Sequence, residues 1–246
     1  FIRILEETKT TILEVVPTYL SILIKEYEHN KKKSSLKYII STGEELSIPL
    51  AQKWFKLFPN IPLVNAYGPT EASDDIAHCI IKKEDHYTKI PIGIPIKNAE
   101  FLIRPIDNED EKGELWVYGI CVGRGYIGNR EETQKYFTTD SNTGKRIYKT
   151  GDIVSKINGN FYYWGRIDNQ IKYNGNRVEL EEIRYYILQI PHIDEAIVFF
   201  DKQAGKICAV YHSEHKIEER DFQLYLKKKI PSYMIPTMFF FVEKMP

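Results

Sequence analysis

The first sixty or so residues alternate between short apolar runs and stretches with helical spacing. Apolar residues that recur every three to four positions predict helices over residues 19–27 and from Ser47 to about Pro59, the second with Ser47 as its cap. Short β-branched or apolar runs, which are typical of buried strands, lie beside them at Thr11–Val16, Lys37–Ile40 and Ile61–Val64. This alternation predicts an α/β layer.

Residues 86–173 have a different pattern, in which short apolar runs are interrupted by Gly, Asn and Asp. The pairs Asn158-Gly159 and Asn174-Gly175 predict two hairpins, because both residue types tolerate the positive φ angles of a type I′ turn. We expect a mostly antiparallel region with strands at Phe101–Arg104, Glu114–Tyr118, Arg146–Lys149, Ile153–Ile157 and Phe161–Trp164.

The pattern becomes mixed again in the last part of the chain. Two helices are predicted, one with Leu180, Ile183 and Ile187 on its apolar face and the other with Phe222, Leu226 and Ile230. Strands are predicted at Ala196–Phe200 and Ile207–Tyr211, and Met238–Val242 has the length of a third. The change near residue 168 predicts two domains, residues 1–167 and 168–246.

Composition narrows the possible partners. The 246 residues contain 34 Lys+Arg and 34 Asp+Glu, so the zero net charge gives no support for nucleic-acid binding. No apolar run reaches the ~18 residues that span a bilayer, and no charged and then apolar leader follows Phe1. Three widely spaced cysteines fit a reducing compartment. We therefore expect a cytoplasmic protein that binds neither nucleic acid nor membrane.

The densest group of chemically useful side chains is the segment Asn65–Glu71, which follows an apolar run. In open α/β sheets, ligands bind at the carboxyl ends of strands. An amide can pair with an adenine edge, a phenol ring can stack on a base, and a carboxylate can hold Mg²⁺. Composition alone nevertheless favours a plain Gly-Pro turn.

Two other groups have plain interpretations. Gly123–Gly128 matches G-x-G-x-x-G, but residues 129–137 are too polar and short for the helix of a dinucleotide-binding unit. Cys208, His212 and His215 could suggest a metal, but two histidines three positions apart on a strand or turn point to different faces. We therefore expect no structural zinc site. Asp152 and Arg166 flank the first hairpin, where they form either an ion pair or a clamp for ribose and phosphate; the sequence leaves both open.

Taken together, five ordered segments resemble the core motifs of adenylate-forming ligases, most closely the amino-acid adenylation domains of nonribosomal peptide synthetases. They are Asn65–Glu71, Gly113–Tyr126, Tyr148–Asp152, Gly165–Glu182 and Pro231–Pro236. The resemblance implies a mixed α/β and β fold. Residues 1–167 would be the last part of the large AMP-binding domain, a βα layer plus a β-barrel-like subdomain. Residues 168–246 would be a small α+β domain that ends before its lysine motif.

The resemblance implies an enzyme that joins an amino acid to AMP with ATP and passes it to the phosphopantetheine thiol of a peptidyl carrier protein. Asn65 would face the adenine and Tyr67 would stack on it, beside Gly68. Thr70 would touch phosphate and Glu71 would hold Mg²⁺, while Asp152 and Arg166 would bind ribose and phosphate. Asp168 would be the hinge of the small domain, and Gly175 would line the pantetheine tunnel.

The resemblance also places an amino-acid pocket on six residues: Glu14, Ile40, Thr42, Ala66, Asp74 and Asp75. Three of the six are acidic, which predicts a cationic substrate such as 2,4-diaminobutyrate or ornithine, because a buried carboxylate needs a counter-charge.

The family's phosphate-binding loop and its invariant lysine have no match in the sequence. We therefore expect a fragment that is nearly inactive alone. The alternatives are a nucleotide-binding or interaction module that does no chemistry, and an acyl-coenzyme A or D-alanyl ligase relative.

Overall fold

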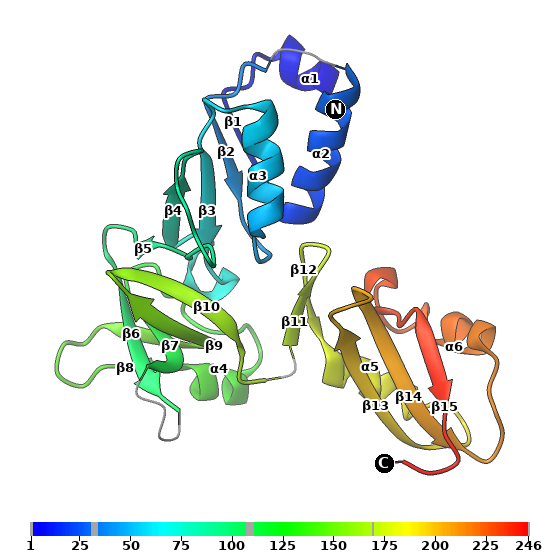
Figure 1. Ribbon diagram of the computed structural model, residues 1–246. Helices are drawn as coiled ribbons and strands as arrows, with labels where there is room; N and C mark the ends of the chain where they lie inside the picture. Colours follow the sequence, from blue (N-terminus) through cyan, green and yellow to red (C-terminus); the bar gives the residue numbers. More distant parts are fainter. Residues whose placement is uncertain (1, 31–33, 107–110, 169, 246) are drawn as a thin grey trace. The chain divides into compact units, whose positions relative to one another are not determined.

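The computed structural model describes residues 2–30, 34–106, 111–168 and 170–245 (Figure 1). The chain forms two compact units, of which the first ends at Ile167 and the second begins at Asp168. This division falls where the hydrophobic pattern of the sequence changes.

The first unit begins with a five-stranded mixed sheet in the order β1-β2-β3-β4-β5. Strands β1 to β3 are parallel, whereas β4 and β5 are antiparallel to their neighbours. The elements are α1 (Ile2–Glu7), β1 (Ile12–Val15), α2 (Pro17–Asn30), β2 (Tyr38–Ser41), α3 (Ile48–Leu57), β3 (Leu63–Tyr67), η1 (Thr70–Ala72), β4 (Ala77–Ile81) and β5 (Ile94–Pro95). The predicted strands and helices of this layer are confirmed, but β3 includes Asn65–Tyr67, which we expected to follow the strand.

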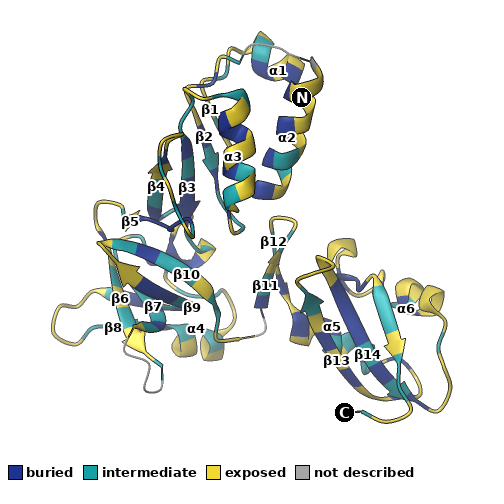
Figure 2. Ribbon diagram, viewed as in Figure 1, coloured by how far each residue is buried: buried dark blue, intermediate teal, exposed yellow. Residues whose placement is uncertain are grey.

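Helices α2 and α3 pack on one face of this sheet (Figure 2). Leu20 and Leu23 of α2 and Trp54 of α3 are almost fully buried against Ile39 of β2 and Leu63 of β3. The Ser47 side chain accepts a hydrogen bond from the Leu50 backbone N–H and so caps α3, as its sequence predicts. The helices therefore cover the face that carries Ile39, and the opposite face is left for other contacts.

The second sheet of this unit is antiparallel, in the order β10-β9-β7-β6, with β8 on β9. Its elements are β6 (Ala99–Pro105), β7 (Lys112–Gly119), α4 (Arg130–Tyr136), β8 (Phe137–Thr139), β9 (Arg146–Ile157) and β10 (Asn160–Arg166). The sequence predicts two strands at 146–149 and 153–157, but the structure forms a single strand, with Gly151 at φ 71° inside it. Strand β7 pairs with β9 on both sides of this glycine, at Lys149 and Ile153, and the Gly151 carbonyl accepts from the Ile167 N–H.

Both Asn-Gly hairpins are confirmed. Asn158 and Gly159 have φ angles of 50° and 84°, and Asn174 and Gly175 have 50° and 75°. Positive φ at both central residues is the requirement of a type I′ turn.

The second unit contains a short hairpin and a three-stranded sheet, β13-β14-β15, with its own apolar core. Its elements are β11 (Gln170–Tyr173), β12 (Asn176–Glu179), α5 (Leu180–Ile187), β13 (Ile193–Asp201), β14 (Lys206–Ser213), α6 (Glu219–Leu226), η2 (Ser232–Met234) and β15 (Met238–Phe241). The last predicted helix ends earlier than expected, at Leu226, although Ile230 is buried beyond it.

Candidate functional site

The carboxyl ends of β1, β2 and β3 bring the predicted pocket residues together. Glu14 is directly opposite Ile40, which is directly opposite Val64. Residues paired in this way point to the same side of a sheet, and Ala66 shares that side because it lies two positions after Val64. Thr42 follows β2, and its backbone N–H donates to the carbonyl of Val15. The predicted pocket residues of β1 to β3 thus lie on the face away from α2 and α3.

Asp75 reaches the same edge from the loop after η1. The Thr42 hydroxyl donates to Asp75 Oδ1 at 2.6 Å. The loop is tightly folded, since Ser73 and Asp74 have left-handed φ angles of 65° and 71°. A Cβ added to Gly68 would lie 1.6 Å from the carbonyl oxygen of Asp74. Gly68 therefore has a packing role that positions Asp74 and Asp75, and its predicted contact with the nucleotide stays a prediction.

Glu14, Asp74 and Asp75 form an acidic cluster at this edge. Partial burial, followed by the negative charges of Asp75 and Asp74, raises the pKa of Glu14 above its ordinary value. The shift indicates that Asp75 and the exposed Asp74 are both near enough to Glu14 to disfavour its charged form. A cluster of this kind favours a proton or another cation between its members.

A second group forms where β9 and β10 meet. Arg166 is opposite Asp152 in the ladder, and its Nη1 donates to Asp152 Oδ1 at 2.8 Å. Both side chains are buried, with exposed fractions of 8% for Arg166 and 3% for Asp152. Two register shifts lie near this pair. The ladder of β9 with β10 shifts between Tyr163 and Gly165, and the ladder of β9 with β7 shifts between Glu114 and Trp116. Such bulges re-aim side chains. Of the two readings left open by the sequence, the ion pair is confirmed and the ribose clamp stays a prediction.

Tyr67 connects this group to β3. Its hydroxyl donates to Asp152 Oδ2 at 2.5 Å, and its ring packs edge-on against Phe101. Burial, followed by the charge of Asp152, raises the pKa of Tyr67 well above its usual value, so the phenol keeps its proton. Only 5% of Tyr67 is exposed. The structure thus gives Tyr67 a role in orienting Asp152, and its stacking on adenine stays a prediction.

Glu71 is held by the glycine-rich segment that resembles a dinucleotide motif. The Tyr126 hydroxyl donates to Glu71 Oε1 at 2.6 Å, and the Gly123 N–H donates to the Glu71 carbonyl at 2.8 Å. Arg146 in turn donates to the carbonyls of Gly123 and Arg124. The helix that follows, α4, leads into β8, which pairs antiparallel with β9, whereas a dinucleotide-binding unit requires a parallel strand there.

Sequence reasoning gave no role to Tyr126 or Arg146. Tyr126 is the last residue of the motif Gly113–Tyr126, and its membership of that motif is a sequence signal that could have identified it as a candidate functional residue. Arg146 had no such signal, because its partners are backbone carbonyls more than twenty positions away in the chain.

The remaining predicted residues have separate environments. Asn65 is buried and its Nδ2 donates to the carbonyl of Pro91 at 2.7 Å, while Thr70 is exposed at the start of η1. In the second unit, Asp168 Oδ1 accepts from the Gln170 N–H, and Gly175 lies in the turn between β11 and β12. The functional roles of these four residues stay predictions.

A family model described as AMP-binding enzyme matches residues 1–127, more than half of the chain. The chain belongs to the AMP-binding enzyme family.

Named relatives of this AMP-binding chain include peptide synthases and carrier-protein ligases. It is 34% identical to tyrocidine synthase 1 of Brevibacillus parabrevis, over all of this chain and 23% of the relative. It is 32% identical to the D-alanine–D-alanyl carrier protein ligase of Bacillus cereus strain G9842, over 98% of this chain and 51% of the relative. The chain thus spans about half, or less, of the curated relatives it matches.

A solved structure supports the fold of this family member. The Vibrio cholerae adenylation domain AlmE, in complex with glycyl-adenosine-5′-phosphate, matches 99% of this chain and 49% of its own length. The TM-score is 0.81 at 23% sequence identity. The mixed α/β fold predicted from the sequence is therefore confirmed. Within the described part of the chain, no helix is both long and apolar enough to cross a membrane.

The residues of this AMP-binding chain fit a magnesium ion that is bound jointly with nucleotide. Mg²⁺ commonly takes one or two carboxylates and obtains its other oxygen ligands from water and phosphates. Glu71 offers a carboxylate oriented by Tyr126, and the exposed Thr70 lies beside it. Among the described residues, no group of three or more His, Cys, Asp or Glu forms a metal cage. The donor set thus fits Mg²⁺ carried in with ATP rather than Mg²⁺ in an all-protein site.

Proposed function

We propose that the whole protein activates an amino acid with ATP and transfers it to the phosphopantetheine thiol of a carrier protein. The family membership supports adenylate formation. The D-alanyl carrier protein ligase supports a carrier protein as the acceptor, and the AlmE complex supports an aminoacyl adenylate as the intermediate. The nucleotide would bind where Tyr67, Asp152 and Arg166 meet, close along the chain to Glu71.

The proposed reaction has two steps. In the first, a carboxylate oxygen of the amino acid attacks the α-phosphorus of ATP, and the bond to the bridging oxygen breaks to release pyrophosphate. In the second, the thiol sulfur attacks the acyl carbon, its proton is lost, and AMP leaves with the bond electrons. Both steps depend mainly on positioning and on stabilisation of negative charge.

Asp152 would hold the ribose during both steps. Each carboxylate oxygen has two lone pairs, so the bonds from Tyr67 and Arg166 leave acceptor capacity for ribose hydroxyls. Because both protein partners fix the carboxylate before nucleotide arrives, little ordering remains to be done on binding. Mg²⁺ bound at Glu71 would neutralise phosphate charge.

The substrate we propose is a cationic amino acid, with ornithine and 2,4-diaminobutyrate as the first candidates. The observation that carries this proposal is the placement of Glu14 on β1 and of Asp75 beside Thr42 at one edge of the sheet, where burial, Asp75 and Asp74 raise the pKa of Glu14. A substrate ammonium placed among these carboxylates would remove their mutual repulsion. The methyl group of D-alanine would leave the repulsion in place, and this argues against a D-alanyl ligase.

ATP–pyrophosphate exchange by the whole protein tests the substrate class. We expect ornithine or 2,4-diaminobutyrate to be preferred over leucine and D-alanine. Glu14→Gln and Asp75→Asn should each lower kcat/KM for the diamino acid by about 10–100-fold, equivalent to ~1.4–2.8 kcal/mol. Glu28→Gln, an exposed change on α2, is the matched control.

Two results would overturn the substrate proposal. One is a preference for a large apolar amino acid that Glu14→Gln and Asp75→Asn leave unchanged. The other is a preference for D-alanine, which would favour the carrier protein ligase instead. If none of the amino acids tested supports ATP–pyrophosphate exchange, the proposed enzyme activity is contradicted, and a module that only binds nucleotide is favoured.

A further inference from the structure

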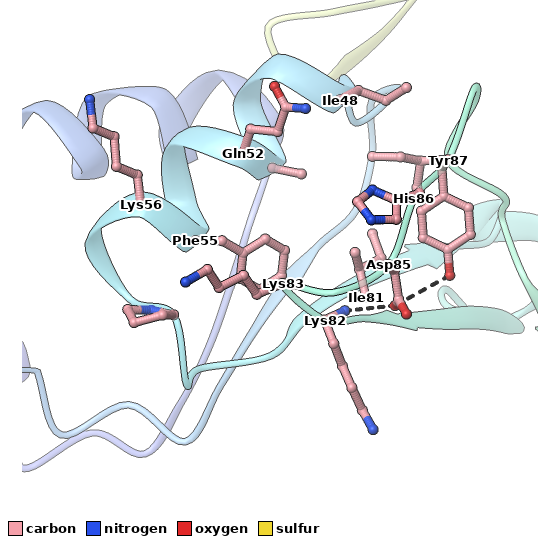
Figure 3. A pocket seen from close by; sticks show the side chains of 13 residues that line it. Ile48, Gln52, Phe55, Lys56, Ile81, Lys82, Lys83, Asp85, His86 and Tyr87 are labelled. Carbon is pink, nitrogen blue, oxygen red and sulfur yellow. Dashed lines mark hydrogen bonds between the residues drawn. The ribbon is translucent and has the colours of Figure 1, made fainter.

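A cavity separate from the candidate site lies between α3 and the segment that follows β4 (Figure 3). Its volume is about 510 Å³, within the ~300–1,000 Å³ range of small-molecule sites. Ile81, which lines it, is paired with Leu63 at the amino end of β3, whereas Tyr67 is at the carboxyl end. Four residue steps along a strand are about 13 Å, so the cavity is at the other edge of the sheet.

The floor of the cavity is apolar. Ala51 and Phe55 of α3 contribute one side, and Ile81 and Ile90 contribute the other; all four residues are buried. An apolar floor of this kind removes water from a hydrophobic ligand body, which is the main source of affinity at such sites.

The rim of the cavity carries excess positive charge. Lys56, Lys82 and Lys83 line it with a single acidic residue, Asp85. Asp85 Oδ2 accepts from the Lys82 backbone N–H at 2.8 Å and from the Tyr87 hydroxyl at 3.5 Å, so this carboxylate is engaged in shaping the loop. The whole chain has zero net charge. The positive rim is therefore a local feature.

The rim residues come from both sides of the cavity, from α3 and from the segment after β4. Lys83 and His86, from the segment after β4, line the same cavity as Phe55, and Figure 3 shows the side chains of Lys56 and Lys82 leading away from the Phe55 ring. A ligand body packed on the apolar floor would lie under a rim that carries three lysines and one carboxylate already engaged in hydrogen bonds, which favours an anionic group on that body.

We propose that this cavity binds a small carboxylic acid with a planar apolar body, such as an aromatic carboxylate. Phe55 and Ile81 would contact the ring, and Lys83 would pair with the carboxylate. This inference goes beyond the proposed function, because it uses none of the residues of the candidate site.

Three probes of one shape and different charge test this inference with the whole protein. They are naphthalene-2-carboxylate, its neutral amide and naphthalen-2-ylmethylamine, each titrated by isothermal calorimetry. We expect the carboxylate to bind tightest and the amine weakest. Lys83→Glu should weaken carboxylate binding by about tenfold or more, since it reverses the charge beside the ligand.

Lys53→Glu is the matched control, since Lys53 is an exposed residue of α3 that does not line the cavity. Carboxylate affinity should change by less than about twofold in this variant, as expected for a distant surface charge. Lys83→Glu should leave ATP–pyrophosphate exchange unchanged, so the outcome is independent of the proposed function. Equal affinity for the three probes, equal weakening by both variants, or no heat with the carboxylate at ~1 mM would overturn the inference.

Discussion

Asp152 illustrates how one buried charge is held by groups of different kinds. Arg166 supplies a full positive charge and Tyr67 supplies a neutral hydrogen-bond donor. The Thr150 hydroxyl accepts from the Asp152 N–H and donates to the carbonyl of Leu115, which anchors the backbone at the bulge. A buried carboxylate that keeps several partners is stable, whereas one that loses a partner carries most of the desolvation cost.

Tyr67→Phe tests this arrangement at a single atom. Loss of the hydroxyl leaves Asp152 buried without one donor, so the free energy of unfolding should fall by about 1.5–3 kcal/mol. Urea unfolding measures the change. Tyr162→Phe is the control, because the Tyr162 hydroxyl makes no hydrogen bond with the described residues and Tyr162 is half-buried. An equal loss in both variants would contradict the role of the Tyr67 hydroxyl.

Glu14 predicts a pH dependence of stability. Its raised pKa means that the folded state binds a proton more tightly than the unfolded state, so stability is lost as pH rises from the ordinary glutamate pKa through the raised value. Glu14→Gln removes this penalty. The variant should therefore be more stable than the natural protein at pH 7.

The gain in Glu14→Gln should disappear at pH values below the ordinary glutamate pKa, where both states are protonated. Urea midpoints measured across this range give the comparison, with Glu28→Gln as the control. A gain that stays constant with pH would show that the substitution acts through packing and not through charge.

At the scale of elements, the turn from β3 through η1 to β4 sets the position of both acidic groups. Glu71 lies within η1, and Asp74 and Asp75 lie in the loop just after it. The loop folds back onto Gly68, where the backbone of Asp74 leaves no room for a side chain. The predicted metal ligand and the predicted substrate carboxylates thus depend on one short piece of backbone.

Gly68→Ala should disturb this turn. A methyl group 1.6 Å from a carbonyl oxygen forces the backbone to move, and overpacking of this kind costs about 1–3 kcal/mol. Thermal unfolding measures the loss, and exchange activity should fall with it because Asp75 moves. Gly144→Ala is the control: a Cβ there meets nothing within 4 Å, although its φ of 68° is also strained for alanine. A smaller loss for Gly68→Ala than for the control would contradict the packing role.

At the scale of the whole molecule, the two units have separate cores and are joined at a polar residue. The first unit ends at Ile167 and the second begins at Asp168. Asp168 is exposed, and its Oδ1 accepts from the N–H of Gln170 within its own unit. The junction between two compact units is the kind of position that absorbs φ and ψ changes in a hinge.

Asp168→Pro in the whole protein tests the hinge. Proline fixes φ and removes the N–H, so we expect one half-reaction to slow much more than the other. ATP–pyrophosphate exchange and thioester formation on the carrier protein measure the two separately. Asp168→Ala, which removes the carboxylate and leaves the backbone free, should affect both far less. Equal loss of both half-reactions in Asp168→Ala would indicate a chemical role.

Several features followed from the sequence because their causes are local. The two Asn-Gly turns require only that neighbouring residues adopt positive φ, and both are present. The cap of α3 at Ser47 and the apolar spacing of α2 and α5 are equally local. The order of the motifs was also sufficient to place the chain in its family, because it depends on residue identity and not on contacts.

Other features were decided by the tertiary structure, because pairing partners far apart in the chain determine them. Strand β3 continues through Tyr67 because β4 pairs with it, and β9 continues through Gly151 because β7 pairs with it on both sides of that residue and Ile167 donates to the Gly151 carbonyl. The bonds from Tyr126 to Glu71 and from Tyr67 to Asp152 join residues separated by 55 and 85 positions. The sequence determined which side chains are available, and long-range pairing alone decided which of them meet, since no local spacing encodes a contact between distant strands.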